Sequence, residues 1–509
     1  MARQQVAPGV VTSPIYRIKG MKSRWEYPNE KAQPENCKSL VNMNLSESGT
    51  AESRNGYTTW NSSVLAGSEP VTGLREQTFA NLTTKHLVCV RDKIYTSTTA
   101  AHTNVTGTLS LSEATADDRT RFTFIRNQVV GTNGKDETWV YSGSGNATAL
   151  SGMPWTTCED VISHRGVLLA LGPTESGTRY PTRVRWSGIN TSTFIPDITS
   201  WPDANRYEIY EGTGAIIGAV DNFGMALIFK EDGLYPASVE YDVGFLELRL
   251  KNPIRGFSPI AKHSIVSRPE FVFGVAKEGA FVFDPGLGFR IITLDIQDEW
   301  ELLNRNRLKY AQSYVREKDH QVRTLLSGAG NASGYDKVLV WDWETGDVWF
   351  DEPTDVMGYG STIDIAGTEY DWLGSNNGFV YQSNVGNDDN GTGYSWAVNM
   401  QPNDLGAPGK SKKIINFRTL YRSRQGQQGA TLQVIRDRGQ FPARSKSITF
   451  STSTWDDTET WDINSSFNSE GSLSDRFFVN RIAETISPTW TGNQPITLDG
   501  YQVEYKIIE

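Results

Sequence analysis

Histidine and cysteine residues are the first candidates for chemistry in this chain of 509 residues. The five histidines lie far apart and show no HExxH or other paired metal-ligand spacing, so each is interpreted as a structural or surface residue. The three cysteines, Cys37, Cys89 and Cys158, match no CxxC pattern, and we expect buried free thiols. The sequence also has no G-x-S-x-G nucleophile motif. These residues predict no catalytic centre, no metal and no cofactor.

Several short motifs approach known sites without matching them. GTGAIIG at 212–218 resembles a dinucleotide loop, but its glycine spacing is off by one and β-type hairpins follow it. NDDNGTG at 387–393 suggests a calcium loop, but Gly386 occupies the first ligand position and no bidentate acid ends the loop. TWDDTETW at 454–461 and DWETGDVW at 342–349 resemble incomplete Asp-box turns of sialidase-like propellers, which are structural even when complete. Glycosidase chemistry would need a carboxylate pair flanking the bond, which the sequence does not locate.

Composition limits the partners of the protein. Apolar residues make up 38% and aromatic residues 11%, enough for a sizeable core. The net charge is -10, so tight binding of duplex DNA over the whole surface is not expected, although a surface past which DNA slides fits this charge. MARQQVAPGVVTSP, at the start of the sequence, lacks the apolar segment of a signal peptide, and the longest apolar runs are too short to span a bilayer. We expect folding in a cytoplasm and no membrane insertion.

The elements that must position any site are strands. Pairs of apolar runs joined by Gly, Asp or Asn turns recur from about 80 to 400, which is typical of hairpins. Residues 309–350 read as strand, turn, strand, loop, strand, turn and strand, which is one propeller blade with Trp341, Trp343 and Trp349 as packing residues between blades. The segment 295–309, with Trp300 and Leu303 on one face, is the exception and predicts a short helix.

The predicted fold class is all-β, a distorted β-propeller with an N-terminal extended arm and a C-terminal β-sandwich. The arm, with the first one or two strands, spans 1–60, the propeller 61–400 and the sandwich 411–509, with a Gly, Asn and Pro-rich linker at 387–413. The blades are not WD repeats, because no Gly-His pair occurs in the chain and the Trp-Asp pairs lack a period of about 40 to 45 residues.

Two basic stretches stand out against the negative net charge. We expect them to be assembly or DNA-facing surfaces, with a solvated strand face as the alternative. The candidate residues are Arg17, Lys19, Lys22 and Arg24 in the arm, and Lys410, Lys412, Lys413, Arg418, Arg422 and Arg424 at the start of the sandwich.

Three phrases of the sequence resemble the tail nozzle proteins of short-tailed bacteriophages, also called tail hub or DNA-stabilization proteins. The first has the form N-x-N-x-x-x-x-G-x-x-x-x-R-x-G-Y and runs from Asn42 to Tyr57. The second is the stretch 162–197 with RVRWSG at its centre, and the third is NFGMALIFKEDGLYPASV at 222–239. The resemblance covers about residues 10 to 400 and leaves the C-terminal sandwich outside.

The resemblance implies a structural protein and not an enzyme. Such nozzles form a homohexameric ring below the portal and its adaptor, line the distal DNA channel, help to retain the packaged genome and offer attachment surface for fibres or spikes. It implies localisation in the short tail of a virion assembled in the host cytoplasm, with double-stranded DNA as a transient partner. Two other classes stay open: a propeller that binds or degrades glycans of the host surface, and an intracellular scaffold of the WD type.

Overall fold

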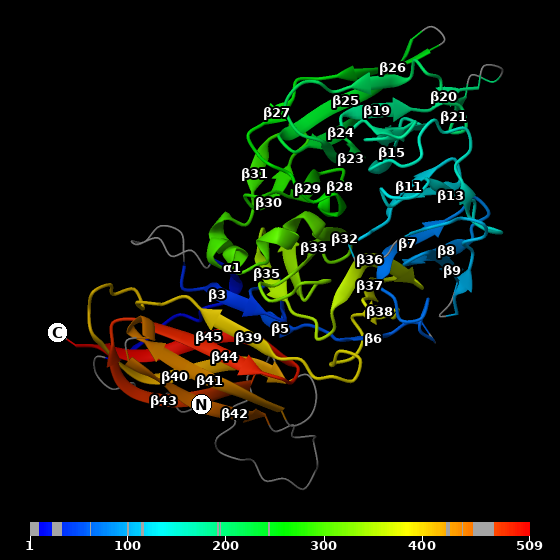
Figure 1. Ribbon diagram of the computed structural model, residues 1–509. Coiled ribbons are helices and arrows are strands. Elements are labelled where there is room, and N and C mark those ends of the chain that lie inside the picture. Colours follow the sequence, from blue (N-terminus) through cyan, green and yellow to red (C-terminus); the bar gives the residue numbers. More distant parts are fainter. Residues whose placement is uncertain are drawn as a thin grey trace.

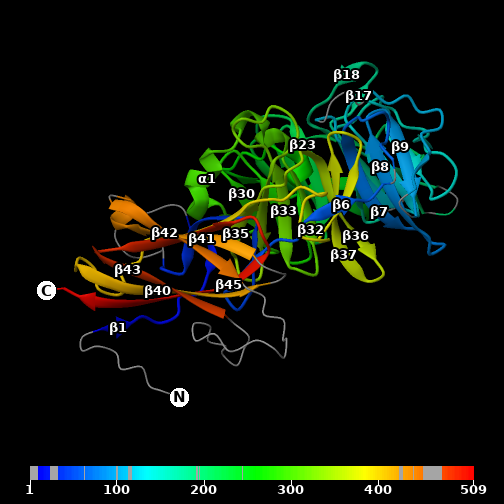
Figure 2. The ribbon, with the colours of Figure 1, turned by 90° about the horizontal axis from the view of Figure 1, so that it is seen from below.

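The computed structural model describes residues 10–22, 33–61, 63–98, 101–112, 117–190, 193, 195–242, 245–423, 428–439, 441–450 and 473–508. It contains a β-propeller and a β-sandwich, which lie side by side (Figures 1 and 2). The all-β fold class predicted from the sequence is confirmed. None of the helices in these ranges is long and apolar enough to cross a bilayer.

The propeller has seven blades of four antiparallel strands each within the described ranges. Five are separate sheets, one carries the additional short strand β27 (Ile254–Arg255), and one continues into the sandwich. The first four blades, each from its inner to its outer strand, are β7 (Val71–Thr78), β8 (Thr84–Val90), β9 (Lys93–Ser97) and β10 (Thr103–Asn104); β11 (Arg121–Ile125), β12 (Gln128–Thr132), β13 (Trp139–Tyr141) and β14 (Thr148–Ala149); β15 (Asp160–His164), β16 (Val167–Leu171), β19 (Arg183–Trp186) and β22 (Arg206–Glu208); and β23 (Ile216–Asn222), β24 (Met225–Lys230), β25 (Gly233–Asp242) and β26 (Phe245–Leu250).

The last three blades close the ring. They are β28 (Val266–Arg268), β29 (Phe271–Val275), β30 (Ala280–Phe283) and β31 (Phe289–Ile291); β32 (Gln312–Arg316), β33 (Gln321–Leu326), β34 (Lys337–Asp342) and β35 (Val348–Asp351); and β36 (Met357–Ile365), β37 (Thr368–Ser375), β38 (Val380–Ser383) and β6 (Tyr57–Thr59). The outer strand β6 of the seventh blade therefore comes from the segment just before the first blade, and its pairing with β38 joins the two ends of the propeller.

Local sequence explains the blade hairpins. Four of them join the first two strands of a blade through two residues that both have positive φ, as the type I′ turn requires. These pairs are Arg126–Asn127, Arg165–Gly166, Phe223–Gly224 and Ala366–Gly367. Apolar clusters then fill the spaces between consecutive blades; Leu87 and Val129, for example, belong to one cluster between the first and second blades.

The sandwich is built from both ends of the chain. One layer has the order β4 (Met43–Leu45), β5 (Ala51–Ser53), β45 (Ile496–Ile507), β40 (Lys412–Ser423) and β43 (Leu473–Ala483), with β1 (Val11–Thr12) also paired to β45. The other has the order β3 (Asn36–Val41), β39 (Trp396–Met400), β44 (Ile486–Gly492), β41 (Gln428–Arg436) and β42 (Phe441–Phe450), with β2 (Lys19–Met21) paired to β3. A parallel bridge from Val41 to Phe350 connects this second layer to β35 of the propeller.

Two predicted boundaries differ from this arrangement. Residues 10–22 and 33–53 are not a separate extended arm, because their strands pair with C-terminal strands and bury Ile18 and Met21 in the core. Nor is 387–413 a free linker, because β39 lies between β3 and β44 inside a sheet. The sandwich thus includes residues from the predicted arm and from the predicted linker.

Short elements complete the fold. The predicted helix is confirmed: α1 (Gln297–Glu301) lies between the 3-10 turns Leu294–Ile296 and Arg305–Tyr310, and Trp300 and Leu303 are buried. Two further 3-10 turns are Lys262–Ser264 and Asp437–Gly439. The third blade carries the small hairpins β17 (Thr174–Glu175) with β18 (Thr178–Arg179) and β20 (Gly188–Ile189) with β21 (Pro196–Asp197).

Candidate functional site

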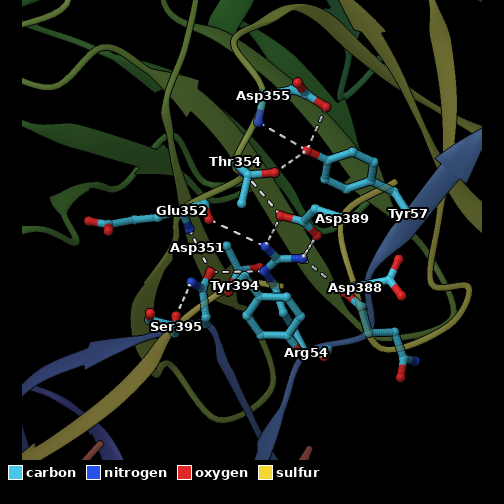
Figure 3. Close-up of polar contacts among 12 residues, drawn as sticks. Arg54, Tyr57, Asp351, Glu352, Thr354, Asp355, Asp388, Asp389, Tyr394 and Ser395 are labelled. Carbon is cyan, nitrogen blue, oxygen red and sulfur yellow. Dashed lines mark hydrogen bonds and ion pairs between the residues drawn. The ribbon is translucent and has the colours of Figure 1, made fainter. Parts of the chain in front are cut away.

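A buried ion pair joins the sandwich to the propeller. Arg54, between β5 and β6, donates two hydrogen bonds to the carboxylate of Asp389, at 2.7 and 2.6 Å. The side chains of Arg54 and Asp389 are only 8% and 0% exposed, and the guanidinium lies 4.1 Å from the centroid of the Tyr394 ring (Figure 3). Burial alone would lower the pKa of Arg54, but the Asp389 carboxylate outweighs it and raises that pKa. Arg54 is therefore held as a cation.

Asn42, Gly56 and Tyr57 of the first phrase also belong to this joint. Asn42 accepts the Nε–H of Arg54 at 2.8 Å and the backbone N–H of Glu352 at 2.7 Å. A side chain at Gly56 is impossible, because a Cβ there would lie 1.7 Å from the backbone oxygen of Asp388. We name this group, Asn42, Arg54, Gly56, Tyr57 and Asp389, the domain joint.

Tyr57 fixes the propeller side of the domain joint. Its hydroxyl donates to the carboxylate of Asp355 at 3.1 Å and accepts the backbone N–H of the same residue at 3.0 Å (Figure 3). Its ring packs on that of Tyr381 in the seventh blade, with centroids 4.9 Å apart. The first phrase of the resemblance thus supplies residues that connect the sandwich to the propeller.

The loop that suggested calcium contributes the acid of the domain joint. Both oxygens of Asp389 are occupied by Arg54, and Asp388 accepts the N–H of Gly391 within a turn. In the described part of the chain, no group of three or more His, Cys, Asp or Glu side chains is arranged to hold a metal ion. The three cysteines are buried free thiols, as predicted.

The second and third phrases also fold around buried cations. In RVRWSG, Arg183 and Arg185 both bond the Glu175 carboxylate, at 2.7 Å and at 2.8 Å. Burial tends to raise the pKa of Glu175, but the two guanidinium groups outweigh it and hold that pKa below its usual range. In the third phrase, Lys230 is fully buried and donates to the backbone oxygens of Ile209 and Glu211. All three phrases therefore contribute to internal structure.

Arg121 occupies the middle of the propeller. From the inner strand of the second blade it bonds the Asp160 carboxylate of the third blade at 3.1 Å. It also donates to the backbone oxygens of Ala219 in the fourth blade, at 3.1 Å, and of Ile265 before the fifth, at 3.4 Å. Asp160 is fully buried and also accepts the N–H of Ala219. One side chain thus ties four consecutive parts of the ring together across its inner strands.

The two basic stretches meet at one place in the sandwich. Arg17 donates to the backbone oxygen of Asp499, and Arg422 to the carboxylate of the same residue at 2.8 Å. Lys19 pairs with Glu35 at 2.6 Å, and Lys22 reaches Asp295 of the propeller at 3.7 Å. Arg24 and Arg424 lie outside the described residues.

Strand β40 divides the second basic stretch between two faces. Lys413 and Arg422 are exposed and Arg418 is partly exposed, whereas Ile414, Phe417, Thr419 and Tyr421 are buried. Lys410, just before the strand, is also exposed. The prediction that Lys412 faces DNA or a partner is wrong. Lys412 is fully buried, and its ammonium donates to the backbone oxygens of Lys410 and Glu484. Its position within the core makes it a structural residue and excludes it from a surface that meets DNA or a partner.

The predicted tryptophans lie in the sixth blade. Trp341 is buried and packs against Phe271 and Phe273 of the fifth blade, with ring centroids 5.2 and 5.8 Å away. Trp343 is only partly buried and also contacts Phe271. Trp349 is fully buried, opposite Val340 in the neighbouring strand of the same blade.

The most important acids of these sites were not singled out from the sequence. Asp389 and Glu175 each pair with a buried arginine, Asp160 pairs with Arg121, and Asp499 joins the two basic stretches. Among the residues of these sites, only the burial of Lys412 could have been inferred from the local sequence. The strict alternation of a strand places Lys412 on the same face as buried Ile414 and opposite Lys413.

Comparisons with known proteins give only distant likenesses. No family model matches the chain, and no curated protein sequence matches it. Among solved structures, it is similar to the WD40 domain of Neurospora crassa Pan2, with 10% identity and a TM-score of 0.39 over 67% of this chain and 97% of that one. It is also similar to BBS1N in a complex with ARL6DN, with 8% identity and a TM-score of 0.39 over 66% of this chain and 99% of that one.

Proposed function

We propose that this chain is a structural tail nozzle subunit of a short-tailed bacteriophage, present in the virion as a homohexameric ring. Its proposed partners are further copies of itself, the adaptor and portal above it, and tail fibres or spikes around it. Double-stranded DNA passes through transiently when the genome leaves the particle.

The domain joint is the observation that carries this proposal. One of the three phrases that resemble nozzle proteins, Asn42 to Tyr57, supplies Arg54, whose buried pair with Asp389 holds the sandwich against the propeller. The strand pairing of β3 with both β39 and β35 adds a second connection. A ring that retains pressurised DNA needs subunits whose parts do not move against each other, and two such connections favour that rigidity.

Charge supports the same role. In the proposed ring, DNA passes along the sixfold axis between the subunits, while Arg121 holds inner strands of each propeller together. Each chain adds a net charge of -10 around that axis, and like charge lets a duplex slide without adhering. The exposed cations Lys413 and Arg422, with the partly exposed Arg418, then form a local surface for the adaptor or for DNA phosphates.

The test is co-assembly. The protein is purified alone and with portal and adaptor, and the mass and symmetry of each complex are measured by native mass spectrometry and electron microscopy. The proposal predicts a sixfold ring of 56.6-kDa chains seated on the adaptor. A chain that stays monomeric and never joins portal and adaptor refutes it.

A further inference from the structure

A groove between the fifth and sixth blades has the chemistry of a sugar-binding site. It has a volume of about 500 Å³ and is lined by Phe271, Phe289, Trp341 and Trp343, with Glu270, Asp284 and Arg290 among its polar residues. This volume lies within the range of small-molecule sites, which combine mainly aromatic walls with a few polar groups. We propose that this groove binds a neutral hexopyranose unit.

Aromatic rings form the floor of the groove. Phe289 is 38% exposed, and on its inner side it packs against Phe257 and Phe283, with ring centroids 4.8 and 5.3 Å away. Trp343, on the opposite blade, is held by Phe271 and by the Arg268 guanidinium, 4.7 Å from its ring. These rings are therefore fixed before any ligand arrives, and the negative π-face of an aromatic ring attracts the C–H face of a pyranose.

Polar groups lie beside these rings. Asp284 is exposed, and one of its oxygens accepts the N–H of Gly288 at 2.8 Å, which fixes the direction of the carboxylate. A Cβ at Gly288 would lie 2.5 Å from the other oxygen of Asp284, so a side chain there would displace this carboxylate. Glu270 is 61% exposed. Carboxylates in such positions accept hydrogen bonds from sugar hydroxyls.

Charge selects the kind of sugar. Within the described part of the chain, Arg290 has no carboxylate partner, and its guanidinium lies 6.0 Å from the centroid of the Trp341 ring. It can donate to a hydroxyl or ring oxygen. Because Glu270 already pairs with Arg268 at 3.2 Å, the charges of Asp284 and Arg290 balance each other in the groove, which suits a neutral sugar. The binding of a neutral sugar goes beyond the nozzle role and does not depend on it.

The test is saturation-transfer NMR on the full chain. The probes are the methyl glycosides of glucose, galactose, mannose and N-acetylglucosamine, with sialic acid as the anionic comparison. We expect at least one neutral glycoside to receive magnetisation on its ring protons. Phe289→Ala should weaken that binding by about tenfold, the loss expected when one aromatic contact is removed.

Two further variants keep the test falsifiable. Tyr210→Ala is the matched control, because Tyr210 is an 82% exposed aromatic residue outside the groove, and this change should leave binding unaltered. Asp284→Asn retains an acceptor for Gly288 and should weaken binding several-fold without unfolding, as verified by an unchanged melting curve. The proposal is overturned if no neutral glycoside binds, if only sialic acid binds, or if folded Asp284→Asn and Phe289→Ala bind as the wild type does. Ring formation with portal and adaptor is scored separately, so failure here leaves the nozzle proposal standing.

Discussion

The domain joint predicts a large loss of stability from one small substitution. Asp389→Ala removes the carboxylate that accepts two hydrogen bonds from Arg54 at 2.6 and 2.7 Å. The guanidinium then stays buried with backbone oxygens of Asn55 and Glu352 and the amide of Asn42 as its partners. Breaking a buried pair by removing one partner costs about 3 to 5 kcal/mol, mainly because the remaining charge is uncompensated.

A surface pair of equal length gives the matched control. Arg91 and Glu69 also approach to 2.6 Å, but their side chains are 48% and 32% exposed. Glu69→Ala should therefore cost at most about 1 kcal/mol. The assay is calorimetry together with guanidinium unfolding followed by tryptophan fluorescence, because tryptophans lie in both folding units. We also expect Asp389→Ala to separate the melting of the sandwich from that of the propeller.

The double variant Arg54→Met with Asp389→Leu distinguishes charge from shape. If the cost comes from the uncompensated guanidinium, this variant should regain a large part of the lost stability, since apolar residues of similar size often replace buried pairs at little cost. The reasoning is refuted if Asp389→Ala costs no more than Glu69→Ala, or if the double variant is as unstable as the single one.

Three other predictions address packing, pH and the basic strand. Trp341→Ala should lower the free energy of unfolding by roughly 3 to 5 kcal/mol and Trp343→Ala by distinctly less, since Trp341 is 1% exposed and Trp343 is only partly buried. Thermal unfolding ranks the two variants, and equal losses would contradict the packing described. Because the pKa of Glu175 is lowered, its stabilisation is complete above its usual pKa of about 4.3 and is lost as pH falls through the lower folded value. The melting temperature of Glu175→Gln should thus lie below that of the wild type at neutral pH and approach it in acid, and a constant difference at all pH values would contradict this. Lys412→Ala should destabilise the fold by about 1 to 3 kcal/mol without changing the salt dependence of assembly. Lys413→Ala should change the salt dependence of assembly and leave the stability of the fold nearly unaltered. The same outcome for both variants would place the two lysines on one face.

Local features of the fold could be predicted from the sequence. The four strands of 309–350 and the short helix near 297–301 follow from periodicity and turn residues within a few positions of each other. The propeller as a class follows because such hairpins recur. The free cysteines were predicted because their spacing excludes the usual ligand and redox patterns.

Long-range pairing could not be predicted in the same way. Val11 pairs with Tyr505 across nearly the whole chain, and Arg54 pairs with Asp389 across 335 residues. Neither pairing leaves a signal in its own neighbourhood. The same limit applies to the strand β39, which lies in a stretch whose Gly, Asn and Pro content is typical of a linker. Asp389 shows the consequence for the site: within NDDNGTG it resembles a solvated turn residue, and only its distant partner reveals its role.

The function we propose for this chain is that of a subunit in the nozzle ring of a short phage tail. Electron microscopy of the complex assembled from portal, adaptor and this protein tests it most directly. We expect a sixfold ring below the adaptor, with each propeller and sandwich placed as one rigid body and an open axis wide enough for duplex DNA. The proposed function is contradicted if the portal and adaptor complexes form without binding this chain. It is also contradicted if the DNA passes through the propeller of a single chain.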